Sequence, residues 1–156
     1  MQTLLDCKQP AHGQAIHKYH MKVTEILTEG LGKRDTYPIL LDFIRFAAKD
    51  LELNSLPKFD FVFDNKGSME RRSFGGYAPG EEHITITVKN RHIMDVCRTL
   101  AHELVHYSQD LKNDLEDDDA GSTGSPQENE ANARAAVIMR NWGKQHPNYF
   151  DKESVE

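Results

Sequence analysis

Residues 91 to 111 carry apolar side chains at three- and four-residue steps, which is the spacing of one face of a helix. These side chains are Ile93, Val96, Cys97, Leu100, Leu104 and Leu111. Away from this face lie His102, Glu103 and His106, in the pattern His-Glu-x-x-His. We therefore predict a helix with one face packed into the core and a separate face that presents two imidazoles and a carboxylate.

The two imidazoles of this motif are spaced to share one metal ion. Residues four apart lie on the same side of a helix, so His102 and His106 point in the same direction. Two such side chains can bind one Zn²⁺, and Glu103 beside them can hold a water molecule without binding the metal. The motif is short enough to arise by chance, in which case both histidines are ordinary surface residues. Its position on a two-faced helix favours the metal site.

A catalytic zinc ion usually has a third protein ligand, and the last predicted helix offers two candidates. This helix runs from about residue 126 to 142 and contains Glu128 and Glu130. The face of Glu128 continues into Ala131, Ala135, Ile138 and Trp142. Glu130 lies about 200° around the helix, where it suits an ion pair with Arg134. We favour Glu128 as the ligand, and Glu130 remains the alternative.

The other patterns predict an α+β fold in one domain over residues 1–156. Two N-terminal helices are expected, at 13–29 and from about Pro38, and the second should be the most buried helix. Alternating apolar residues predict strands at 58–65 and 83–90, and a third, short strand around Ser73 stays open. The motif helix and the glutamate-bearing helix complete the domain, followed by a polar tail from about residue 144.

Composition narrows the classes of partner and location. The net charge of −6 argues against a nucleic-acid partner, although Arg71 with Arg72, or Arg91 with Arg98, are candidates for a local basic patch. No apolar run reaches transmembrane length, and the N-terminus lacks the apolar core of a signal peptide. Cys97 is predicted to be a buried free thiol. We expect a cytoplasmic protein of the producing or infected cell, without a membrane partner.

With these residues the chain resembles the minimal gluzincin metallopeptidases, which pair His-Glu-x-x-His with a glutamate on a following helix. The gluzincin pattern Glu-x-x-x-Asp falls on Glu128 and Asn132, with Asn in place of Asp. The stretch "ENEANARAA" is also similar to the ImmA/IrrE-type metallopeptidases. Over residues 73–143, the chain resembles small His-Glu-x-x-His proteins of tailed bacteriophages.

The resemblance implies a zincin-like fold, a Zn²⁺ ion bound by His102, His106 and Glu128, and hydrolysis of a peptide or protein substrate. Glu103 would act as the general base, and Asn132 would hydrogen-bond a zinc-bound imidazole. The strand at residues 83–90 would run along the cleft, and an extended substrate would pair with Ile84 to Val88. The alternative function is a non-catalytic protein-binding module of the same fold, which would have no use for Glu103.

Several other polar residues are weaker candidates. Tyr77 follows Gly75-Gly76, a flexible loop that could overhang the cleft, and is the preferred candidate to stabilise an oxyanion. His83, His92 and Tyr107 are the others. Asp110, one turn after His106, is either a support for the site or an exposed side chain. A second metal site at His12, His17 and His20 is disfavoured, as is a protease acting on DNA-bound proteins, which would need a basic face.

Overall fold

The computed structural model describes residues 36–63, 73–115 and 121–151, and within them the chain has the expected α+β organisation. The elements are α2 (Thr36–Asp50), β1 (Lys58–Val62), β2 (Gly75–Ala78), β3 (His83–Thr87), α4 (Ile93–Asp110), α5 (Pro126–Gln145) and the 3₁₀ helix η2 (Pro147–Asp151). The helix expected at residues 13–29 lies outside the described residues.

The three strands form one mixed sheet in the order β1-β3-β2. β3 pairs with β1 in parallel, with Phe59 opposite Ile84, and with β2 in antiparallel, with Tyr77 opposite Ile84. Both edges of β3 are therefore occupied, and the prediction that a substrate pairs with residues 84–88 is wrong. The prediction used only the position of this strand just before the motif helix. It could not show that β1, from a distant part of the sequence, pairs with the other edge of β3.

The third strand, β2, begins at Gly75 rather than around Ser73 and forms one outer edge of the sheet. The N–H of Thr87 donates to the carbonyl of Phe74, so residues 74 and 87 form a hydrogen-bonded pair. Such pairs alternate along an antiparallel ladder. The peptide groups of Gly76 therefore face β3, and those of Gly75 and Tyr77 face the outer edge.

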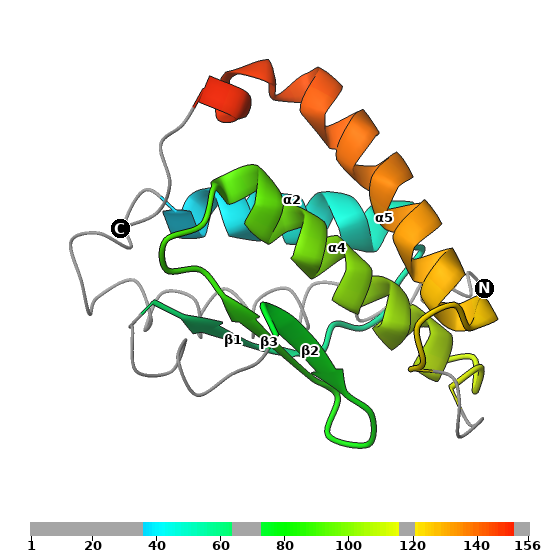
Figure 1. Cartoon of the computed structure of the whole chain (residues 1–156). Coiled ribbons are helices and arrows are strands. Elements are labelled where there is room, and N and C mark those ends of the chain that lie inside the picture. The colour runs from blue at the N-terminus through cyan, green and yellow to red at the C-terminus, as the bar shows by residue number, and fades with distance from the viewer. Residues whose placement is uncertain (1–35, 64–72, 116–120, 152–156) are drawn as a thin grey trace, which may run out of the picture.

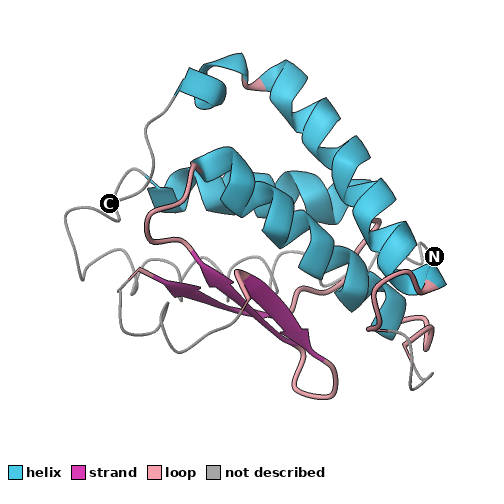
Figure 2. Ribbon diagram, in the orientation of Figure 1, coloured by secondary structure: helices cyan, strands magenta, loops and turns pink. Residues whose placement is uncertain are grey.

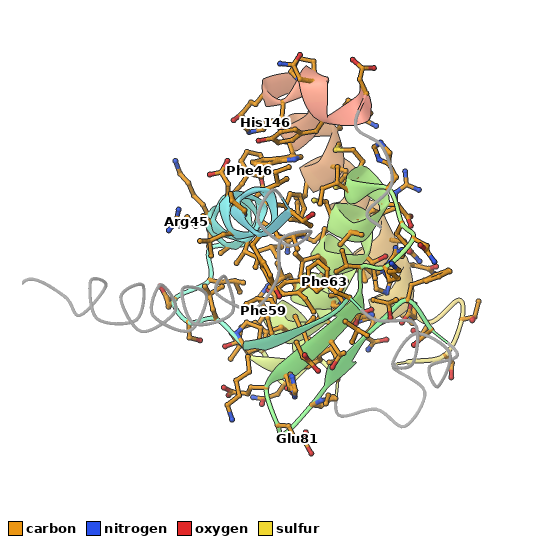
Figure 3. The ribbon with its side chains drawn as sticks, turned by 90° about the vertical axis from the view of Figure 1, so that its left-hand side faces the viewer. Arg45, Phe46, Phe59, Phe63, Glu81 and His146 are labelled. Atoms are coloured by element: carbon orange, nitrogen blue, oxygen red, sulfur yellow. The ribbon has the colours of Figure 1, made fainter. Side chains whose placement is uncertain are left out.

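The three helices lie on one face of the sheet (Figures 1 and 2). On that face, Ile84 and Ile86 of β3 are fully buried. The ring of Tyr37 on α2 contacts two phenylalanines of the β1 segment. Phe61 lies within β1 and Phe63 just after it, with ring centroids 6.0 and 5.0 Å from that of Tyr37. Figure 3 shows Phe59 and Phe63 beside the sheet and Glu81 at the tip of the β2–β3 hairpin.

The most buried helix is α4 and not α2, contrary to expectation. α4 has 13 buried residues among its 18, whereas α2 has 7 among 15. The reason is position, since α4 packs against the sheet as well as against both other helices. Five of the six predicted core residues of α4 are buried, and Cys97 is a buried free thiol. Leu111 is the exception, because it caps the helix end and is 47% exposed.

Arg91 and Arg98 do not form the basic patch that the sequence allowed. Arg91 is 6% exposed and is bound by Asp95 and by the carbonyl of Thr87, so it ties the end of β3 to the start of α4. Arg71 and Arg72 lie outside the described residues. None of the helices in residues 36–63, 73–115 and 121–151 is both long and apolar enough to cross a bilayer.

The C-terminal segment is more ordered than a polar tail from residue 144 would be. α5 continues to Gln145, and η2 follows it. The ring of His146 lies on Trp142 with centroids 3.7 Å apart, and Tyr149 stacks on His146 with centroids 5.1 Å apart. This aromatic packing holds residues 146–149 against the end of α5.

Candidate metal centre

The first turn of α5 brings a carboxylate to the histidines of α4. Ser125 caps the helix, and its Oγ accepts the N–H of Glu128 at 3.2 Å. The helix thus begins early enough for Glu128 to project from its first turn, as predicted. Ala131 and Ala135 are buried on the same face, so their small side chains allow α5 to approach α4 closely. This packing sets the distance between Glu128 and the two histidines.

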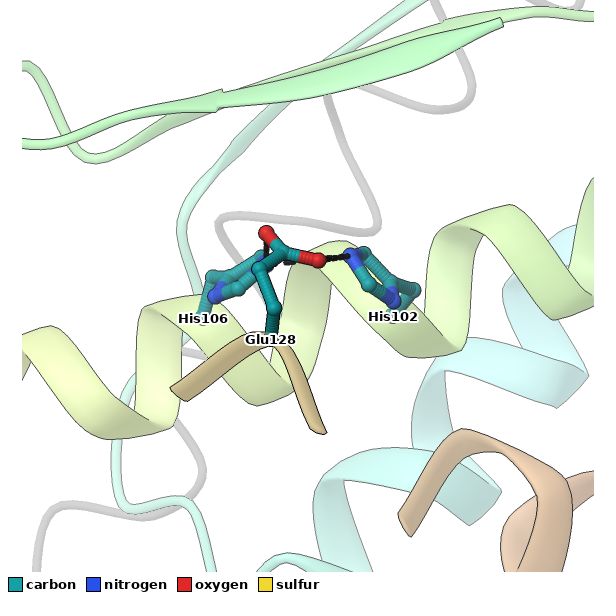
Figure 4. Close-up of side chains that lie close together, drawn as sticks. All are labelled: His102, His106 and Glu128. Atoms are coloured by element: carbon teal, nitrogen blue, oxygen red, sulfur yellow. Dashed lines mark hydrogen bonds and ion pairs between the residues drawn. The ribbon is translucent and has the colours of Figure 1, made fainter. Parts of the chain in front are cut away.

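His102, His106 and Glu128 converge on one point (Figure 4). The Nε2 atoms of the two histidines are 3.0 Å apart. The Glu128 oxygens lie 3.4 Å from Nε2 of His102 and 3.0 Å from Nε2 of His106. Ligands at zinc-bond lengths in a tetrahedral site are about 3.3 Å from one another. The two Nε2 atoms have nearly this spacing, each has a Glu128 oxygen at a similar distance, and one donor atom from each residue lies within 4.8 Å of the other two. The group is therefore compact enough to hold a single metal ion.

The ring of His102 is supported by Asn132, as the sequence predicted. Burial and the neighbouring His106 lower the pKa of His102, and they outweigh a hydrogen bond to the side chain of Asn132, which favours the charged ring. A neutral imidazole is the form that binds a metal. The environment of His102 therefore favours the ligand form of the ring, and Asn132 fixes the direction in which the ring points.

The ring of His106 is supported by Gln109, which the sequence analysis missed. Nδ1 of His106 lies 2.8 Å from Oε1 of Gln109. Nε2 of Gln109 donates to the carboxylate of Glu130 at 2.8 Å, and this carboxylate also lies 3.8 Å from Arg134. The Glu130–Arg134 ion pair was expected, and Glu130 is absent from the three-donor group. The signal for Gln109 was its place three residues after His106, one turn along the helix.

Glu103 lies beside this group with an unusual protonation equilibrium. Its side chain is buried, and burial raises the pKa of the carboxyl group to about 7. His106 and a hydrogen bond from the backbone of Tyr77 oppose the increase, whereas the negative charge of Glu128 adds to it. A carboxyl group that titrates near neutral pH can both accept and return a proton.

Tyr77 does not lie on a flexible loop but on strand β2, facing α4. Its hydroxyl donates to the carboxylate of Asp110. Asp110 is therefore a half-buried partner of Tyr77 rather than an exposed side chain. Its ring contacts that of Tyr107 edge to face at 5.8 Å between centroids. The Tyr77 hydroxyl is therefore held near the C-terminal end of α4, and its suggested contact with an oxyanion stays a prediction.

The other oxyanion candidates are less well placed. His92 caps the start of α4, ten residues before His102, which is about 15 Å along the axis. The hydroxyl of Tyr107 is bound to Ser55 at 2.7 Å, and its side chain is fully buried. His83 begins β3 and is half-buried. The three N-terminal histidines considered for a second metal site lie outside the described residues.

The donor set, two imidazole nitrogens and a carboxylate oxygen, fits a metal ion, although the arrangement by itself does not identify the metal. Comparison of the chain with protein-family models, with curated proteins and with solved structures found no match.

Proposed function

We propose that this protein is a zinc-dependent peptidase in which Glu103 is the general base. The observation that carries the proposal is the convergence of His102, His106 and Glu128 beside a buried carboxyl group that does not belong to the donor set. The two Nε2 atoms are 3.0 Å apart, and each has a Glu128 oxygen at 3.0–3.4 Å. A purely structural metal site has no use for such a carboxyl group. The resemblance of the motifs to those of gluzincins supports the same conclusion, and the α+β fold would then be zincin-like.

Zinc is the metal that suits these ligands best. Two imidazoles and one carboxylate, with a fourth position left for water, form a common catalytic zinc set. When bound, Zn²⁺ supplies Lewis-acid chemistry, which makes a water molecule more acidic and polarises a substrate carbonyl. His102 and His106 would bind it through Nε2, and Glu128 through a carboxylate oxygen.

Glu103 would move the proton that peptide hydrolysis requires. Its carboxylate accepts a proton from the attacking water as the new C–O bond forms. It then returns this proton to the amide nitrogen as the C–N bond breaks, which leaves a carboxyl product and an amine product. Burial raises the pKa of this carboxyl group, which favours uptake of the proton that it later returns.

An extended substrate would pair with the outer edge of β2 rather than with β3. No strand pairs with the outer edge of β2 within the part of the chain that the structure describes, and the Tyr77 backbone on this edge hydrogen-bonds Glu103. A chain added at this edge would pass next to the proposed base. The packing of β2 on α4 therefore determines where a scissile bond would lie.

The test is a comparison of wild type with Glu103→Gln on a broad peptide library, after loading each protein with Zn²⁺. We expect cleavage by the wild type and a loss of several orders of magnitude in the variant, with zinc content unchanged. Matched turnover by the two proteins would show that any cleavage has another origin. No cleavage by zinc-loaded wild type would contradict the peptidase and favour the binding module.

A further inference from the structure

The side chain of Gln109 links His106 on α4 to the first turn of α5. Gln109 is only 2% exposed, so its amide must find its partners within the protein. Oε1 lies 2.8 Å from Nδ1 of His106. Nε2 contacts the carbonyl oxygen of Gln127 at 3.0 Å and the Glu130 carboxylate at 2.8 Å.

These contacts determine which end of the amide faces the histidine. A backbone carbonyl and an ionised carboxylate can only accept hydrogen bonds. The Gln109 atom that faces both must therefore be the NH₂ group, because the carbonyl end would be repelled by each of them. It follows that the amide oxygen is the atom that faces His106.

The orientation of the amide in turn determines the tautomer of His106. An amide oxygen accepts, so Nδ1 of His106 must carry the hydrogen. In a neutral ring the other nitrogen, Nε2, then has a free lone pair. Nε2 is the atom that lies 3.0 Å from Glu128 and 3.0 Å from His102. Gln109 thus presents His106 in its ligand form.

We infer that Gln109 is a positioning residue that holds His106 in the Nδ1–H tautomer, and that Glu130 acts through Gln109 to hold the amide in place. Glu130 is the glutamate on α5 that does not join the donor group, so the two glutamates of "ENE" have separate tasks. Glu128 contributes a ligand oxygen, and Glu130 orients the support of another ligand. The part of this inference that concerns metal affinity rests on the proposed metal centre.

The tautomer can be measured without any metal. In the metal-free protein the Glu128 carboxylate, 3.0 Å from Nε2 of His106, competes for the ring hydrogen, so the test is made in chelator-treated Glu128→Ala. There the ¹⁵N shifts of the His106 ring should show the Nδ1–H tautomer as the main neutral form. Gln109→Met keeps the approximate size of the side chain but removes the acceptor, and it should shift the population toward Nε2–H. Gln127→Ala is the matched control, since it removes a half-buried side chain that binds the carbonyl of Asp114 and keeps the backbone carbonyl that Gln109 uses.

Metal affinity gives a second, separate readout. Gln109→Met should weaken Zn²⁺ binding by roughly 10- to 100-fold, which is the usual cost of losing the hydrogen-bond partner of a ligating histidine. Glu130→Ala should cost a few-fold, and Glu130→Gln should restore near wild-type affinity because its amide oxygen still accepts from Gln109.

The two readouts separate failure of the inference from failure of the proposed function. An Nε2–H ring in Glu128→Ala, or a tautomer population that Gln109→Met leaves unchanged in this background, would overturn the role of Gln109 whatever the metal data show. The expected tautomer in Glu128→Ala, together with a wild type that binds no zinc, would instead refute the metal centre and leave the tautomer assignment standing. Unchanged zinc affinity in Gln109→Met would overturn the link between Gln109 and metal binding.

Discussion

The backbone of Tyr77 on β2 forms a hydrogen bond with the carboxyl group of Glu103 on α4. Two residues earlier, Gly75 has almost no free space on the side that faces the same helix. An added Cβ would lie 2.5 Å from Cγ2 of Thr99 and 3.4 Å from Oε1 of Glu103. The sheet edge and the proposed base are thus in direct contact, and a glycine makes this close approach possible.

Gly75→Ala should therefore disturb both the packing of β2 and the function of Glu103. A methyl group 2.5 Å from Thr99 forces β2 away from α4, and overpacking of this kind costs about 1–3 kcal/mol. Urea unfolding should report this loss, and zinc-dependent hydrolysis should fall with it. Gly76→Ala is the matched control, because its Cβ would meet no atom within 4 Å. Equal effects of the two substitutions would show that the contact at Gly75 is unimportant.

Replacing either histidine of the motif should abolish stoichiometric metal binding. Purified protein should carry about one Zn²⁺ per chain. His102→Ala and His106→Ala should each reduce this to a trace, since the remaining histidine and Glu128 would bind the metal only weakly. Elemental analysis measures the content. His83→Ala removes an imidazole from outside the donor group and should leave it unchanged. Full zinc retention by both motif variants would exclude this site.

The two glutamates of α5 should differ sharply in their effect on zinc affinity. Glu128→Ala removes a ligand oxygen and should weaken binding by orders of magnitude, whereas Glu130→Ala should cost only a few-fold. Competition with a chromogenic chelator measures both constants. A larger loss in Glu130→Ala than in Glu128→Ala would mean that the third ligand has been assigned to the wrong side chain.

The raised pKa of Glu103 predicts that Glu103→Gln stabilises the chelator-treated protein in a pH-dependent way. An acid with a pKa of 4.5 when unfolded and about 7 when folded destabilises the folded state as pH rises through this window. The penalty is absent below pH 4.5 and complete above pH 7, where it is on the order of 3 kcal/mol. Glutamine stays neutral and avoids it.

Urea unfolding of wild type and Glu103→Gln at several pH values checks this prediction. The difference in the free energy of unfolding should grow from near zero at pH 4.5 to its full value near pH 8. Taking the difference between the two proteins removes the contribution of the titrating groups that do not interact with Glu103. A difference that does not change with pH would mean that the Glu103 pKa is close to its ordinary value.

Much of the candidate site follows from local sequence patterns. The period of α4 placed His102 and His106 one turn apart and Cys97 in the core, and the period of α5 placed Glu128 on the side of Ala131 and Trp142. These predictions concern residues within one helix. Their relative directions are set by the geometry of the helix itself, which needs no information about the rest of the chain.

The tertiary structure decided everything that depends on contacts between distant segments. Whether β3 lies at an edge depends on β1, which pairs with it in parallel from more than twenty residues away. The contact between Gln109 and Glu130 depends on how α5 docks on α4, and the place of Tyr77 beside Asp110 depends on how β2 packs there. A repeat of apolar residues shows which face of an element is buried, but it does not specify the partner. That choice is made by the packing of the whole core, in which each element must fill the space that the others leave.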